Sequence, residues 1–98
     1  MSYFVHVAFD MTNQDSEAYR AIEEALNTMG LYSTIEGSSK KTLTLPANTF
    51  AGKFTGESAG KIRDDLCTKI QDAFRAHNIH GNIFVSVGGD WAWGMRSP

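Results

Sequence analysis

The first candidate for chemistry is the carboxylate of Asp10, which directly follows the run Tyr3-Phe4-Val5-His6-Val7-Ala8-Phe9. This run is rich in aromatic and β-branched residues and alternates, with Val5, Val7 and Phe9 on one side, so it predicts a central β-strand. Many α/β-type active sites place a carboxylate at the end of such a strand, beside a loop. Aspartate also commonly ends strands and starts turns, so a purely structural Asp10 is the alternative.

Four further residues could assist a reaction or a binding step near Asp10. His6 shares a side of the strand with Asp10 and could transfer a proton, although strand histidines are also often just packed or solvated. Arg20 is expected on the exposed side of a helix, and Lys40 and Lys41 form an adjacent basic pair in the loop 37–41. These cations could position phosphate groups, and a solvated hairpin tip is the alternative for the lysine pair.

Four aromatic residues outside the predicted core suggest an interaction surface. Phe4 and Phe84 fall on the strand faces turned away from the predicted helices, and Trp91 and Trp93 form a short aromatic segment. Exposed rings of this kind serve in protein interfaces or stack on the bases of nucleic acids. We therefore predict that these four residues are interface residues.

The elements that must position these groups follow from residue periodicity. Helical spacing predicts a helix from Asp15 or Ser16, either of which could cap it, to Gly30. A second, stronger helix is predicted from 59 to about 77, after a loop and cap over 55–58. Alternation predicts strands over 31–36 and 82–87. A third strand, broken by a proline, is expected over 42–54, with 49–54 as its main part, and a short fifth strand over 91–94 is left open.

The resulting order is strand, helix, strand, strand, helix, strand. This order predicts an α+β fold, the ferredoxin-like βαββαβ two-layer sandwich, with an antiparallel sheet and both helices on one of its faces. The buried faces of the helices should meet the inward side of the first strand. The buried residues are expected to be Val5, Val7, Phe9, Ile22, Leu26, Ile62, Leu66 and Phe74.

Length and composition limit the classes of function. The 98 residues form one domain, 1–98, and the net charge of −2 does not favour wholesale electrostatic capture of nucleic acid, so RNA contact needs a local basic patch. The single cysteine, Cys67, is expected to pack as a small apolar residue and excludes an intramolecular disulfide. No apolar run of spanning length or signal-peptide pattern is present, so we expect a cytoplasmic protein without membrane contact.

Several segments resemble a group of small nucleases. Residues 7–11 resemble the first-strand signature of CRISPR-associated endonucleases and VapD-like toxins, and residues 30–37 are similar to the second-strand region of the former. Residues 48–51 and 58–62 are similar to the third strand and second-helix start of GhoS-like type V antitoxins. The resemblance implies the ferredoxin-like fold, a metal-binding role for Asp10, and cleavage of RNA. The segment Trp91-Ala92-Trp93 matches no signature of these families.

Two hypotheses for the function follow, and the sequence leaves open whether the chain is an enzyme. In the first, the protein is a Mg²⁺-dependent endoribonuclease related to toxin–antitoxin or CRISPR-associated families, with Asp10 as the catalytic metal ligand. One carboxylate holds Mg²⁺ poorly, so a homodimer or a substrate phosphate must complete that site. In the second, the open sheet face or the segment 91–93 serves a non-catalytic homodimeric or RNA-binding module.

Overall fold

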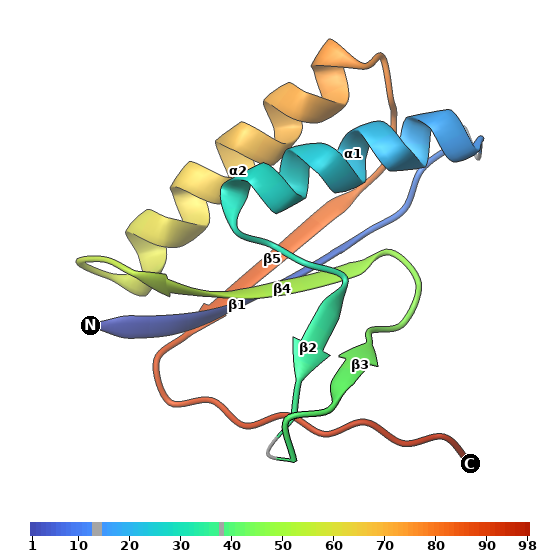
Figure 1. The fold of residues 1–98 in the computed structure, drawn as a ribbon. Helices are drawn as coiled ribbons and strands as arrows, with labels where there is room; N and C mark the ends of the chain where they lie inside the picture. Colours follow the sequence, from blue (N-terminus) through green and yellow to red (C-terminus); the bar gives the residue numbers. More distant parts are fainter. Residues whose placement is uncertain (13–14, 38) are drawn as a thin grey trace.

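The structure, a computed structural model, describes residues 1–12, 15–37 and 39–98. Asn13, Gln14 and Ser38, which belong to two of the predicted loops, lie outside the described residues. The chain forms a mixed α+β domain with antiparallel strands and two helices (Figure 1). In chain order its elements are β1 (Ser2–Phe9), α1 (Ser16–Met29), β2 (Thr34–Glu36), β3 (Thr42–Thr44), β4 (Thr49–Thr55), α2 (Ala59–Ala76) and β5 (Ile83–Gly88).

The core is organised around the alternation of β1. Tyr3, Val5, Val7 and Phe9 are buried, whereas the residues between them are half-buried or exposed. The buried side chains join one hydrophobic cluster with those of both helices, and Figure 1 shows the helices next to each other above the strands. All the core residues expected from the sequence belong to this cluster: Val5, Val7, Phe9, Ile22, Leu26, Ile62, Leu66 and Phe74.

Both helices begin at the capping residues that the sequence indicates. The carboxylate of Asp15 accepts the backbone N–H of Ala18 at 2.7 Å, which satisfies one of the free donors of the first turn of α1. At the other end Gly30 has a φ of 95°, a left-handed conformation that glycine adopts without steric cost. The hydroxyl of Ser58 accepts the N–H of Lys61 at 3.1 Å and caps α2 in the same way.

The main sheet has three strands in the order β4-β1-β5, and both pairings are antiparallel. Phe4 pairs with Lys53 on one side and Gly88 on the other, so the side chains of these residues share one face. The same register places His6 and Phe84 on that face. We call the face away from the buried side chains of β1 the open face.

The second strand region separates from this sheet. Strands β2 and β3 form their own two-stranded hairpin, and the chain before β2 pairs with the main sheet at an isolated bridge between Tyr32 and Ala51. The interruption between β3 and β4 has a cause in the sequence, because Pro46 lacks an N–H and Asn48 turns the chain with a φ of 59°. The predicted third strand therefore exists as two pieces, and 49–54 is indeed its main part.

The short strand that the sequence left open over 91–94 does not form, and residues 89–98 run along the molecule without helix or strand (Figure 1). One expectation from the sequence, the packing of Cys67, is wrong. Cys67 is exposed on α2 rather than packed, because the helix turns Ile62, Leu66 and Ile70 inward instead. Among the described residues no helix has the length and apolar character needed to span a membrane.

Candidate functional site

Asp10 directly follows β1 and makes two contacts with the start of β5. Its carboxylate Oδ1 accepts the backbone N–H of Asn82 at 2.6 Å, and its own N–H donates to the carbonyl of Asn82 at 3.0 Å. The carboxylate therefore fastens the end of one strand to the start of another. Its second oxygen has no hydrogen-bond partner within the described ranges, and the residue is exposed.

The backbone beside Asp10 leaves no room for a side chain at Gly81. A Cβ added there would lie 1.8 Å from the Asp10 carbonyl oxygen, so glycine is required by close approach. The N–H of Thr12 also donates to the carbonyl of His80 at 2.8 Å. Residues 80–82 thus lie tightly against residues 10–12, a constraint that the sequence patterns did not locate.

No group of three or more His, Cys, Asp or Glu side chains gathers into a metal-binding cluster among residues 1–12, 15–37 and 39–98. His6 does not join Asp10, because four residues along an extended strand span about 13 Å. Its ring instead meets Phe84 edge to face, with centroids 6.1 Å apart. A metal at Asp10 would need ligands from a substrate phosphate or a second copy, as the sequence already implied.

The predicted interface residues lie on or against the open face. The rings of Phe4 and Trp91 stack with centroids 5.8 Å apart and an interplanar angle of 22°. Phe84 keeps 59% of its surface exposed and Trp93 keeps 40%. Tyr32, which pairs with Ala51, adds a further exposed aromatic residue at the edge of the sheet. No local sequence pattern indicates this position, because the pairing is non-local.

A largely apolar groove of about 410 Å³ crosses the open face. The sheet forms its floor, the β2–β3 hairpin forms one wall, and the segment after β5 forms the other. We call it the sheet groove. Its lining residues include Phe4, His6, Ile35, Leu45, Trp93 and Met95.

A second depression, of about 460 Å³, continues from the sheet groove toward the tip of the hairpin. The two share Trp93, Gly94 and Met95, so they form one track along the segment after β5. Arg96 and Glu36 line the second depression and give it charges of both signs.

The charge of the protein is distributed unevenly over its two sides. The outward positions of β4, β1 and β5 carry Lys53 and His6 but no carboxylate. The full set of these positions is Ser2, Phe4, His6, Ala8, Thr49, Ala51, Lys53, Thr55, Phe84, Ser86 and Gly88. Eight of the 11 acidic residues instead lie in the helices or their capping turns: Asp15, Glu17, Glu23, Glu24, Glu57, Asp64, Asp65 and Asp72.

The three predicted phosphate-binding cations are not brought together. Lys40 and Lys41 are exposed in the turn of the hairpin, where the N–H of Gly37 donates to the carbonyl of Lys41 at 3.0 Å. That turn borders the second depression through Gly37. Arg20 lies on α1, and Figure 1 shows this helix above the sheet and the hairpin below it.

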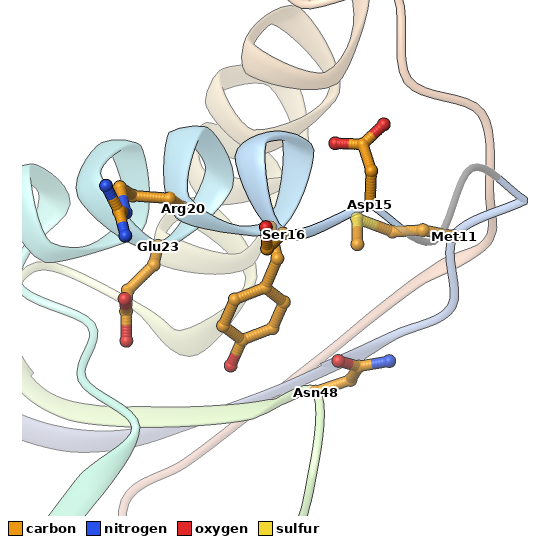
Figure 2. Close-up of a pocket in the computed structure, with 7 residues that line it drawn as sticks. Met11, Asp15, Ser16, Arg20, Glu23 and Asn48 are labelled. Carbon is orange, nitrogen blue, oxygen red and sulfur yellow. The ribbon is translucent and has the colours of Figure 1, made fainter.

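Arg20 instead lines a separate groove of about 430 Å³ between α1 and the turn before β4 (Figure 2). Asp15 and Glu23 line the same groove, so a phosphate bound there would meet carboxylates as well as the guanidinium. Burial raises the pKa of Tyr19 in this groove, and the Glu23 carboxylate raises it further. The mixed charge makes this groove a weaker candidate for binding phosphate than the open face.

Compared with protein-family models and with curated proteins, the chain matches no family model and no curated protein at a significant level.

Proposed function

We propose that this protein is a ferredoxin-like βαββαβ domain, with both helices on one face of the sheet, that binds single-stranded RNA on the other face. The observation that carries the proposal is the pair of exposed rings, Phe84 and Trp93, on a face whose outward strand positions hold no carboxylate. Bases stack on such rings, and each stacked base contributes about 1–3 kcal/mol.

The track through the two depressions suits an extended single strand. Bases would meet His6 and Trp93 in the sheet groove, and Phe84, whose ring meets that of His6 edge to face, would offer a further stacking surface beside it. The backbone phosphates would meet Lys53 on the open face and, toward the hairpin, Arg96. Lys40 and Lys41 add positive charge near that end. The net charge of −2 does not oppose this, because most acidic residues lie in the helices or their caps, and surface charges more than a Debye length apart are largely screened.

The proposal includes the cellular setting. The domain would act in the cytoplasm, in RNA processing of the kind associated with toxin–antitoxin or CRISPR-associated systems. The small size and aromatic open face support that role, since RNA-binding modules of this layered type stack RNA bases on aromatic side chains of their sheet.

Titration of fluorescein-labelled single-stranded RNA, followed by anisotropy, tests the proposal. Replacing Phe84→Ala should weaken binding about tenfold, because one stacking surface is lost, whereas Phe84→Tyr should bind nearly as the wild type does. Lys53→Ala should reduce the dependence of affinity on salt, because the variant makes one phosphate contact fewer and its binding therefore releases fewer counterions. Lys69→Ala is the matched control, since it removes an exposed lysine from α2.

Two results would contradict the proposal. Wild-type protein that binds no single-stranded RNA at low salt and high micromolar concentration would overturn it. Equal loss of affinity in Lys53→Ala and Lys69→Ala would show that RNA binding does not depend on the open face in particular.

Metal-dependent RNA cleavage at Asp10 is a second candidate, supported by the position and exposure of its carboxylate. Phe84 pairs with Ala8, two residues before Asp10, so RNA on the open face would pass near this carboxylate. With one oxygen committed to Asn82, the other could ligate Mg²⁺ held mainly by the substrate phosphate. The metal would polarise the phosphodiester and acidify water. Cleavage assays with Mg²⁺ and with a chelator, using the wild type and Asp10→Asn, test this role.

A further inference from the structure

The two edges of the three-stranded sheet differ in how they end. At the β4 edge, Tyr32 and Ala51 exchange two backbone hydrogen bonds of 2.9 Å, and Lys53 adds a charge. At the β5 edge, no described residue pairs with the strand. Exposed strand edges are templates for pairing with another chain unless something blocks them.

The register identifies which backbone groups of β5 are unpaired. The N–H of Asp10 donates to Asn82, so Asn82 and every second residue after it direct their backbone groups toward β1. The residues between them, Ile83, Val85 and Val87, direct their N–H and C=O groups outward. The opposite edge of the sheet supports this alternation. There the backbone groups of Ala51 also point away from β1, and Ala51 is the residue that pairs with Tyr32.

β5 carries none of the features that normally protect an edge. Its sequence, Ile-Phe-Val-Ser-Val-Gly, contains no proline and no charge, and its pairing with β1 runs without a bulge. Next to the start of the strand, α2 presents uncharged residues. Exposed Cys67 and Gln71 line a small depression of about 270 Å³ there, together with Ile83.

We propose that β5 pairs with β5 of a second copy of this chain, in antiparallel orientation, about a twofold axis at Val85. Val85 would exchange hydrogen bonds with the partner subunit's Val85, and Ile83 with the partner subunit's Val87. The two sheets become one continuous sheet, and the interface is the same patch on both copies.

The strand itself indicates that the occupant is a second copy. On the face opposite the open face, Val85 has Ile83 on one side and Val87 on the other, so the strand presents nearly the same apolar side chains when it is reversed. The strand carries no charged residue, so no like charges would oppose each other in it, and Cys67 and Gln71 of α2, which lie beside Ile83, are uncharged too. On the open face, Phe84 would lie beside the partner subunit's Ser86, which leaves room for the large ring.

This interface differs from the two homodimer contacts predicted from the sequence, which used the open face or Trp91-Ala92-Trp93. It leaves the sheet groove of each copy uncovered. It is independent of RNA binding, since the pairing uses backbone groups of β5 and not the groove.

Sedimentation velocity measures the oligomeric state of the full chain and of Val85→Pro. The N–H of Val85 faces outward, so proline there removes an intersubunit hydrogen bond but no bond to β1. We expect a wild-type dimer at micromolar concentration and a folded Val85→Pro monomer, with circular dichroism as the check of folding. A wild type that remains monomeric at high micromolar concentration overturns the proposal, as does a Val85→Pro dimer of unchanged affinity.

A cross-link tests the register without a proline. The variant carries Cys67→Ser, Phe84→Cys and Ser86→Cys on one chain. In the dimer, position 84 of each copy would face position 86 of the other copy as a non-hydrogen-bonded pair. Their Cα atoms would be about 4.5 Å apart, within the range that disulfides span. Oxidation should give a covalent dimer. A dimer that persists without cross-linking would show that the chains associate through another surface.

Discussion

The two faces of the three-stranded sheet come from the same strands but present different classes of residue. On the face opposite the open face, Tyr3, Val5 and Val7 are buried in the core, whereas on the open face His6 and Phe84 remain exposed. The acidic residues are concentrated on the helices, and the outward strand positions have none. A single two-residue alternation thus separates the residues that stabilise the fold from those free to bind.

The largest contrast between the faces should be in stability. Leu26 retains 1% of its surface, so Leu26→Ala should lower the free energy of unfolding by about 3 kcal/mol through lost burial and a cavity. Phe84→Ala, on the open face, should cost less than about 1 kcal/mol. Urea denaturation measures both. Similar losses for the two variants would show that the open face is part of the core.

Substitutions next to the strand ends should lower stability even where the residue itself is exposed. Gly81→Ala places a methyl group against the Asp10 carbonyl and should destabilise the protein by about 2 kcal/mol, because the backbone must shift. Gly88→Ala is the control, since a Cβ there meets nothing within 4 Å. Thermal denaturation compares the two, and an equal change in midpoint would contradict the close packing at Gly81.

Substitutions at Asp10 separate a structural role of its carboxylate from a catalytic one. Asp10→Ala leaves the N–H of Asn82 without its side-chain acceptor and should cost about 1 kcal/mol. Asp10→Asn retains an oxygen acceptor and should cost less. If Asp10 holds a metal, both variants lose Mg²⁺-dependent cleavage although their stabilities differ. Cleavage that survives in both would assign the carboxylate to the strand junction alone.

The smallest effect should be found on the helix side, at Tyr19. The pKa of its hydroxyl is raised above 10.0, first by burial and then by Glu23. The folded state therefore holds this proton more tightly, so the stabilisation is present below pH 10 and declines as pH rises through the folded pKa. Glu23→Gln should lower the pKa of Tyr19, measured by NMR titration of its ring. An unchanged pKa would leave burial as the sole cause.

The sequence predicted features that local patterns determine. The alternation of β1, the caps Asp15 and Ser58 and the left-handed Gly30 each depend on a few neighbouring residues, and each is present. The break at Pro46 was readable for the same reason, since proline cannot donate to a ladder.

Features that depend on distant contacts were not predictable. Nothing near Tyr32 indicates that it pairs with Ala51, and nothing near Trp91 indicates that its ring stacks on Phe4. The separation of Arg20 from Lys40 and Lys41 likewise follows from how α1 and the hairpin are placed around the sheet. Residue types identified the candidate site residues, but their grouping is set by tertiary structure.

The placement of Trp91 and Trp93 has a spectroscopic consequence. These are the two tryptophans of the chain; the ring of Trp91 stacks on Phe4, and Trp93 lines the groove. Tryptophan emission therefore originates from Trp93 in the wall of the sheet groove and from Trp91, whose ring stacks on Phe4 of that groove. A ligand that enters the groove would change the wavelength or intensity of that emission, whereas changes at the helices would leave it nearly constant. The protein thus carries its own fluorescent reporter, and occupancy of the groove can be followed without a label.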